Sequence, residues 1–415
     1  TDHLIKAQNI YMRLSDYEKA KRILRRLIRE YPEEDQYKIE LATIYSETGR
    51  ADSAMTLLQP IAAENPHSDA AALLGELYFQ TGRMDSAYST LLPLDEGDST
   101  DVRVLYYLGG AALNQDSLNA AEGYYRQLMD RHTDILGGYF GLGVVLRRQE
   151  RYQDAIEVLS QGVRNFPDEP ELYEHLGINY YFTGQQDSAW NQLDRAYAID
   201  STLAGYYNLA ITLRNEERSE EAIAVLSRAK QMYPPEAELY EQLGIAYYAG
   251  QQYQEAKQQL LEALSLKPDQ LRPKHFLAFV YDQLGQQDSA EVIYKELLEA
   301  VPDEPLYLNN LAYLYAVQGK NLETALEFVK KALERAPNNA SYLDTMGWVY
   351  YKMGQYEEAR EYISEALHRD STNVEVLDHM GDVYSKLGNR EMAQEFYKKA
   401  LEKNPENALI RKKLQ

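Results

Sequence analysis

Alanine recurs at nearly equal intervals along the whole 415-residue chain. A fixed period of this length predicts one supersecondary unit copied end to end. Such an array grows without starting a new core, so the length does not by itself call for several domains. The alanines stand 33, 34 or 35 residues apart, at Ala20, Ala54, Ala87, Ala121, Ala155, Ala189, Ala222, Ala256, Ala290, Ala325, Ala359 and Ala393.

Other residue types keep a constant distance from this alanine. We number each repeat so that the alanine is position 20, and the repeats then begin at residues 1, 35, 68, 102, 136, 170, 203, 237, 271, 305, 340 and 374. Position 8 is Gly or Ala in all but the first repeat, position 11 is usually Tyr, position 15 is often Gly, and position 32 is usually Pro. Small residues allow two helices to cross closely, glycine allows the turn between them, and proline ends the second helix. Each repeat is therefore predicted to be a pair of helices.

This pattern resembles the tetratricopeptide repeat. The eleventh repeat shows the match clearly, with Gly347, Tyr350, Ala359 and the proline that precedes it at Pro337. The resemblance covers residues 1–407 and implies an all-α fold, an α-solenoid of antiparallel helix pairs coiled into a right-handed superhelix. It also implies a non-enzymatic scaffold that binds a protein or peptide segment in a concave groove.

Irregular repeats suggest how the array is divided. We expect repeats 1–3 over residues 1–101, Gly-rich repeats 4 and 5 over 102–169, repeats 6–12 over 170–407, and a short helix over 408–415. The third repeat ends irregularly after Pro93. Glycines lower helix stability by about 1 kcal/mol each relative to alanine, so 102–169 is a candidate soft joint. The alternative is that these glycines only permit tighter packing.

The composition excludes several classes of partner and chemistry. With 43 Lys and Arg against 65 Asp and Glu, the net charge is −22, which repels nucleic acid and anionic lipid surfaces. The chain has no cysteine, which excludes disulfides and thiolate catalysis. It has no apolar run long enough to insert in a membrane. It begins at Thr1, as expected if a leader were removed or the chain trimmed, and export to the periplasm or cell exterior is favoured over the cytoplasm.

The sequence shows no recognisable catalytic, cofactor or metal motif. Its seven histidines include no pair spaced for a zinc-binding helix. His368 follows Glu365, and His379 lies near Asp378 and Asp382. We expect both histidines to lie on solvated helix faces and not to hold a metal. We therefore predict no enzyme activity, no cofactor and no metal.

The resemblance implies that positions 2, 5, 9, 12 and 13 of the first helices face the groove. Three arginines among them form a predicted basic patch, and a row of aromatic residues follows. An extended segment with an acidic or carboxylate end would suit such a surface. The alternative is that the aromatic side chains pack between neighbouring repeats. The predicted groove residues are Arg147, Arg148, Tyr181, Tyr207, Arg214, Asn215, Tyr248, Phe279, Tyr313, Trp348 and Tyr351.

A second hypothesis concerns self-assembly. Solenoids normally end in polar caps, and a terminal repeat without one exposes an apolar face. Head-to-tail contacts between such faces do not close, so they would build a filament, here an extracellular homopolymer. The alternative is that a short cap is sufficient. The residues predicted to make these contacts are Leu4, Ile5, Tyr11, Leu409, Ile410 and Leu414.

Overall fold

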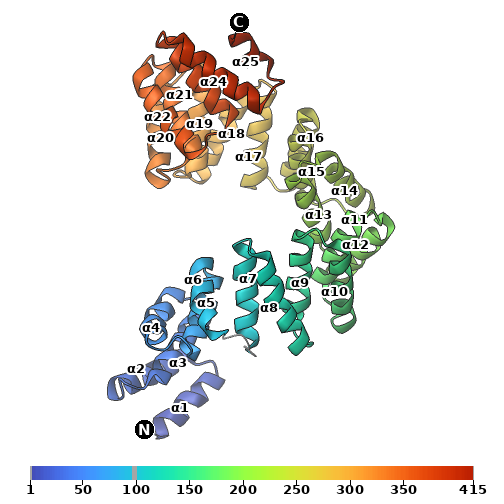
Figure 1. Cartoon of the computed structure of the whole chain (residues 1–415), viewed down its shortest axis with the longest axis vertical. Helices are drawn as coiled ribbons and strands as arrows, with labels where there is room; N and C mark the ends of the chain where they lie inside the picture. Colours follow the sequence, from blue (N-terminus) through green and yellow to red (C-terminus); the bar gives the residue numbers. More distant parts are fainter. Residues whose placement is uncertain (1, 96–100, 415) are drawn as a thin grey trace. The chain divides into compact units, whose positions relative to one another are not determined.

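The computed structural model describes residues 2–95 and 101–414, and within them all regular structure is helical. Consecutive helices pair along the chain, two to each repeat, as the ribbon in Figure 1 shows. The predicted all-α solenoid of helix pairs is confirmed.

The chain divides into two compact units, residues 1–209 and residues 210–415. We call them the N-terminal unit and the C-terminal unit, and each is described by itself. The division falls inside α13 (Ala204–Asn215) and therefore not within residues 102–169. The predicted soft joint at 102–169 stays a prediction.

The N-terminal unit begins with repeats 1–3, of which the third ends irregularly, and continues through the Gly-rich repeats. Residues 96–100, which continue the irregular end of the third repeat, lie outside the described residues. The helices are α1 (Asp2–Arg13), α2 (Tyr17–Glu30), α3 (Asp35–Glu47), α4 (Ala51–Glu64), α5 (Asp69–Gln80), α6 (Met84–Leu91), the 3-10 turn η1 (Leu92–Leu94), α7 (Val102–Asn114), α8 (Leu118–Arg131), α9 (Leu136–Arg148), α10 (Tyr152–Asn165), α11 (Pro170–Phe182) and α12 (Gln186–Asp200).

The C-terminal unit continues the alternation of first and second helices and ends with a short additional helix. The helices are α14 (Ser219–Met232), α15 (Ala237–Ala249), α16 (Tyr253–Leu266), α17 (Leu271–Gln283), α18 (Gln287–Ala300), α19 (Pro305–Gln318), α20 (Leu322–Arg335), α21 (Ala340–Lys352), α22 (Tyr356–Arg369), α23 (Val374–Lys386), α24 (Arg390–Lys403) and α25 (Ala408–Lys413).

Small residues at positions 8 and 20 mark where the two helices of a repeat touch. A Cβ atom added to Gly347 on α21 would stand 2.4 Å from Cγ1 of Ile363 and 3.0 Å from the carbonyl oxygen of Ala359, both on α22. Real Cβ atoms do not approach other atoms so closely. The period of small residues therefore reflects direct helix–helix contact.

Position 15 carries the turn between the two helices, and its backbone is left-handed in every repeat. The φ angle there lies between 54° and 80°. Glycine adopts this conformation without strain, whereas other residues resist it. Seven repeats have glycine at position 15 and five do not; the five are Ser15, Asp116, Glu150, Glu217 and Gln251.

The glycines of repeats 4 and 5 make room for large rings. A Cβ at Gly141 would stand 2.3 Å from the Tyr125 ring, and one at Gly109 would stand 2.8 Å from the same ring. Tyr125 is 4% exposed, so its ring fills the space that both glycines leave. These contacts favour the tight-packing interpretation of the Gly-rich stretch over loose packing.

Candidate binding cavity on the first helices of the C-terminal unit

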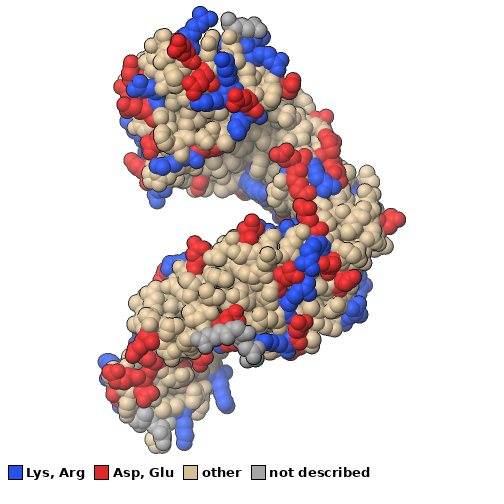
Figure 2. Space-filling model, viewed as in Figure 1, with Lys and Arg blue, Asp and Glu red and all other residues tan. Residues whose placement is uncertain are grey.

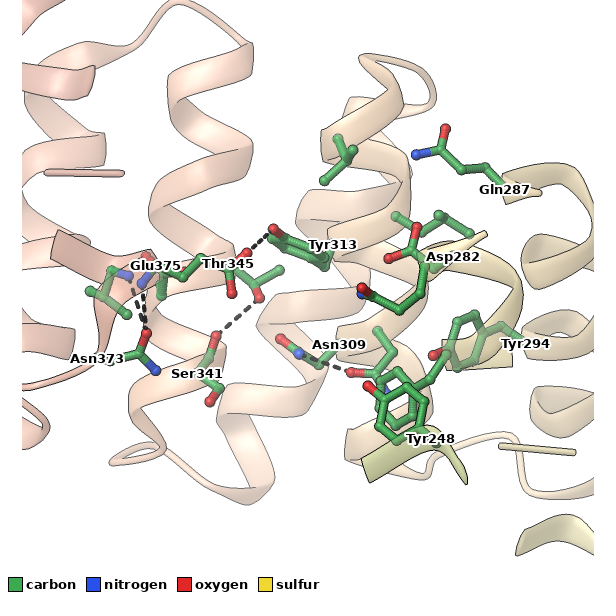
Figure 3. A pocket seen from close by; sticks show the side chains of 17 residues that line it. Tyr248, Asp282, Gln287, Tyr294, Asn309, Tyr313, Ser341, Thr345, Asn373 and Glu375 are labelled. Carbon is green, nitrogen blue, oxygen red and sulfur yellow. Dashed lines mark hydrogen bonds between the residues drawn. The ribbon is translucent and has the colours of Figure 1, made fainter. Parts of the chain in front are cut away.

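A cavity of about 510 Å³ opens on the first helices of the last five repeats. Its walls come from α15, α17, α19, α21 and α23, with Gln287 and Tyr294 added from α18. Figure 3 shows these side chains turned toward a common space. The first helices place them there because positions 2, 5, 9 and 12 recur on one helix face.

Three of the predicted groove residues line this cavity: Tyr248, Phe279 and Tyr313. The Tyr248 and Phe279 rings are stacked, with centroids 6.1 Å apart and planes 25° apart. They lie on neighbouring first helices, α15 and α17. The stacked pair leaves an aromatic wall that is only partly covered by protein.

Carboxylates converge on Tyr313 from three first helices, α17, α21 and α23. The Tyr313 hydroxyl donates a hydrogen bond to Glu375, as drawn in Figure 3. Burial raises the pKa of Tyr313, and the charges of Glu375, Asp344 and Asp282 raise it further. Burial also raises the pKa of Asp282, helped by the charge of Glu375, although a hydrogen bond from Gln287 opposes this shift. Three carboxylates therefore lie close enough to Tyr313 for their charges to raise its pKa.

A buried ion pair supports the wall behind these carboxylates. His379 Nδ1 lies 3.0 Å from Asp344 Oδ2, and both side chains are less than 10% exposed. The Trp348 ring stacks on His379 with centroids 3.9 Å apart. Burial lowers the pKa of His379, but the charge and hydrogen bond of Asp344, together with the charges of Glu375 and Asp378, outweigh burial, and the pKa is raised. The prediction of a solvated His379 was wrong because Asp344 comes from the preceding repeat, 35 residues away.

Amide side chains line the rest of the cavity. Asn309 is 5% exposed, and its Oδ1 accepts no hydrogen bond, while its Nδ2 donates to Asn310 Oδ1 at 3.4 Å. Asn310 Nδ2 lies 3.2 Å from Nε2 of His275. Burial lowers the pKa of His275 to about 4, so its ring is neutral at pH 7. A buried acceptor without a donor is uncommon in proteins.

Four other predicted aromatic residues are largely occupied by packing. Trp348 and Tyr351 stack on each other at 4.6 Å, and Trp348 is 8% exposed. In the N-terminal unit, Tyr181 and Tyr207 are 8% and 7% exposed, and Tyr181 lies 5.7 Å from the Trp190 ring. These ring contacts lie within one repeat, whereas the Trp348 ring also stacks on His379 of the next repeat, as the alternative interpretation expects for Trp348.

The predicted basic residues are distributed over both units. Arg147 and Arg148 lie on α9 in the N-terminal unit, whereas Arg214 and the exposed Asn215 lie in the C-terminal unit. Arg148 donates to the Leu113 carbonyl at 2.8 Å and to Asp116 at 3.0 Å. Arg214 donates to Gln242 at 3.2 Å, and burial lowers its pKa. A shared basic patch stays a prediction.

The residues predicted for self-assembly differ in exposure. At the start of the chain, Leu4, Ile5 and Tyr11 are partly buried. In α25, Leu409 is 71% exposed, whereas Ile410 is 2% exposed and packs with Leu377, Ala393, Tyr397 and Ala400. Leu414 is partly buried against the same cluster. Ile410 is thus already used inside the chain.

A second cavity, of about 600 Å³, lies in the Gly-rich repeats of the N-terminal unit. Its lining is mainly apolar and aromatic and includes Tyr106, Ile135, Phe140 and Phe166. A Cβ at Gly137 would stand 2.7 Å from the Tyr106 ring, so this glycine allows the ring to lie against α9. None of the predicted groove residues lines this cavity.

Asn309, at position 5 of its repeat, is among the residues that the resemblance implies to face the groove, and it lines the cavity. The acidic residues were not predicted: Asp344 stands at position 5 of its repeat, Asp282 at position 12 and Glu375 at position 2. These are positions implied to face the groove. Reading carboxylates at the same positions would have found them.

Charge and chemistry elsewhere on the surface are less concentrated. On the face drawn in Figure 2, acidic and basic side chains are mixed over each unit. Within residues 2–95 and 101–414, no group of three or more His, Asp or Glu side chains is arranged to hold a metal ion. No helix in the same ranges has the length and apolarity needed to cross a membrane.

Sequence models described as tetratricopeptide repeat match residues 11–73, 181–413, 108–170 and 140–204. The BBSome complex member BBS4 of Bos taurus is 26% identical over 209 residues, which cover 50% of this chain and 40% of that protein. Its Drosophila melanogaster homolog is 23% identical over 235 residues, 53% of this chain and 48% of that protein. The chain therefore spans less than half of these relatives. The crystal structure of the APC/C hetero-tetramer Cut9–Hcn1 is 15% identical, with a TM-score of 0.47, and the match covers 100% of this chain and 89% of that one.

Proposed function

The chain belongs to the tetratricopeptide repeat family, and from that premise we propose that it is a non-enzymatic scaffold that holds a segment of a partner protein. One observation carries the proposal: five successive first helices contribute side chains to a single cavity of about 510 Å³. A surface built from that many repeats suits an extended chain, because each repeat offers the next contact along the segment.

The chemistry of the cavity supports binding and not catalysis. The cavity presents aromatic rings, amides and carboxylates, which give contact area and directional hydrogen bonds. His275, the histidine hydrogen-bonded to Asn310, is kept neutral by burial. His379 is fixed by Asp344 below the wall and is buried away from solvent.

Photo-crosslinking tests the proposal at side-chain resolution. A benzoylphenylalanine replacing Gln283, which is exposed and lines the cavity, should form a discrete adduct with a partner in cells that express the chain. The matched control places the same group at Val292, which is 56% exposed on α18 and does not line the cavity. Adducts from position 292 alone, or equally from both positions, would show that the cavity is not the binding surface.

Self-assembly through terminal repeats remains the second hypothesis. The exposed Leu409 favours it, whereas the burial of Ile410 within the chain counts against it. Light scattering over a hundredfold concentration range separates the two hypotheses. A monodisperse monomer at the highest concentration excludes the filament, and growth that Leu409→Ser abolishes supports it.

A further inference from the structure

We propose that the C-terminal cavity receives a lysine or arginine side chain from a basic segment of the partner protein. This inference rests on the proposed scaffold function and specifies the chemistry of its partner. It reverses the charge of the partner expected from the arginines in the sequence.

The cavity combines three carboxylates with no cation of its own. Asp282, Asp344 and Glu375 line it, and its lining contains no Lys or Arg. Within the described residues, the three carboxylates have one cationic partner, the buried His379, which lies beside Asp344. Like charges that share a partly buried space repel one another, and a cation placed between them relieves that repulsion.

Elsewhere in the same unit, the chain supplies such a cation itself. Position 5 of the eighth repeat is Glu241, and Arg272, at position 2 of the ninth repeat, lies 2.9 Å from it. In the pocket the corresponding residues are Asp344 at position 5 of the eleventh repeat and Glu375 at position 2 of the twelfth. A carboxylate therefore stands where the eighth and ninth repeats place a guanidinium. Asp344 is paired with the buried His379 instead, and Asp282 and Glu375 have no Lys or Arg beside them in the cavity lining.

The end of the chain shows how these helices hold a lysine. Lys413 Nζ lies 2.8 Å from Asp378 Oδ2 and 2.8 Å from Asp382 Oδ2, and it stands 5.6 Å from the centre of the Tyr397 ring. Two carboxylates and one aromatic ring enclose the ammonium group. The cavity offers the same combination through Asp282, Glu375 and the rings of Tyr248 and Tyr313. Aromatic faces and carboxylates both attract a cation, and the rings also cover its aliphatic stem.

An amide oxygen without a hydrogen-bond donor also favours a cationic ligand. Asn309 lines the cavity, is more than nine-tenths buried, and has an Oδ1 atom that accepts no hydrogen bond. A guanidinium or ammonium group consists only of donors, so it would supply the hydrogen that this oxygen lacks. Asp282, Asp344 and Glu375, which line the same cavity, are also acceptors when ionised. An acidic segment would add carboxylates beside these three and would bring no charged donor to Asn309 Oδ1.

The test uses the full chain and a labelled peptide probe with an Arg-Tyr-Arg core flanked by glycine and serine. Asp282→Asn with Glu375→Gln removes two cavity carboxylates, and we expect the dissociation constant to rise at least about tenfold, since each substitution removes one charge-assisted contact. The matched control, Glu327→Gln with Glu334→Gln, removes two exposed charges from α20 in the same unit and should change it less than about twofold. Circular dichroism confirms that both variants are folded.

Two further probes separate specific from general attraction. A peptide with citrulline in place of arginine keeps the shape and loses the charge, and it should not bind. A peptide with glutamate in place of arginine should also fail. Equal weakening by the cavity and α20 variants, or tighter binding of the glutamate peptide, would overturn the inference.

The inference and the scaffold function fail in different ways. If the segment crosslinked to residue 283 is mapped and carries no Lys or Arg at the contact, the scaffold function stands and the cation site does not. If no adduct forms at residue 283 and the arginine peptide also fails to bind, both are rejected.

Discussion

The two cavities use the same repeat architecture for opposite chemistry. In the Gly-rich repeats of the N-terminal unit, glycines such as Gly137 make room for rings such as Tyr106, and the cavity is mainly apolar. In the last repeats of the C-terminal unit, Asp282, Asp344 and Glu375 line the cavity together with tyrosines. Helix pairing is the same in both. The comparison shows that the recurring residues determine the backbone, while the side chains that vary between repeats determine what each unit can hold.

A similar contrast appears between two histidines that occupy the same position of their repeats. His175 and His379 both stand at position 6 of a first helix. His175 contacts the Phe140 ring at 4.7 Å, and burial together with the charge of Arg147 lowers its pKa to about 4. His379 contacts Trp348 and Asp344, and its pKa is raised. Side chains from adjacent repeats thus shift the pKa values of these two histidines in opposite directions.

The largest expected change in stability comes from breaking the buried ion pair between His379 and Asp344 in the C-terminal unit. Asp344→Ala leaves His379 buried without its partner, and we expect a loss of about 3 kcal/mol in stability. Asp344→Asn keeps a hydrogen-bonding group and should cost less. Hydrogen exchange read by mass spectrometry reports the two units separately. Protection should fall in α21–α24 and remain unchanged in α7–α10. An equal loss in both units would mean that they do not respond independently.

The next effect tests tight packing in the N-terminal unit. Gly141→Ala places a methyl group 2.3 Å from a Tyr125 ring atom, and overpacking of this kind costs about 2 kcal/mol. Gly123→Ala is the matched control because a Cβ there meets no atom within 4 Å, and it should stabilise α8 by about 0.5–1 kcal/mol. Urea denaturation measures both changes. If Gly141→Ala were also stabilising, the repeats would be loosely packed, as the soft-joint hypothesis requires.

A pH titration of stability should separate the two histidines. The folded-state pKa of His175 is lowered to about 4, so its contribution is present above pH 6.5 and is lost as the pH falls from 6.5 to 4. The folded-state pKa of His379 is raised, so its contribution is present below pH 6.5 and is lost as the pH rises through the folded value. For His175 the change from pH 6.5 to pH 4 corresponds to as much as about 3 kcal/mol in the N-terminal unit. For His379 we expect a change of the opposite sign in the C-terminal unit.

Nuclear magnetic resonance of the two imidazole rings checks the assignment of these titrations. His175→Gln should flatten the acid-side loss in the N-terminal unit, and His379→Gln should flatten the alkaline-side loss in the C-terminal unit. Titration of both rings at the same pH would contradict the opposite shifts.

The smallest effect concerns an arginine predicted to bind a partner. Arg148 bonds to the Leu113 carbonyl and to Asp116, so Arg148→Met should cost about 1 kcal/mol or less in the N-terminal unit. Thermal denaturation measures the change. No loss of stability, together with weaker partner binding, would restore Arg148 to the groove role that the sequence suggests.

The repeat period alone was sufficient to predict the helix pairs, because the small residues at positions 8 and 20 report a contact within one repeat. Tyr248, Phe279 and Tyr313 were found for the same reason: a position in the repeat determines the helix face. Contacts between repeats were not predictable. Asp344 meets His379 across 35 residues, and nothing in either local sequence shows that pairing. The sign of the cavity's charge was missed because carboxylates on helices normally indicate a solvated face.

The left-handed turns have a mechanical consequence. Glycine occupies position 15 in all of the last four repeats, whereas repeats 4, 5, 7 and 8 place Asp116, Glu150, Glu217 and Gln251 in the same conformation. A non-glycine residue in this conformation costs about 1 kcal/mol relative to glycine, and among the last four repeats only the tenth carries one in its turn, Asn321. In a solenoid each repeat contacts only its neighbouring repeats, so a pulling force unfolds the least stable repeats first. Under tension, we expect the middle of this array to yield before its carboxyl-terminal end.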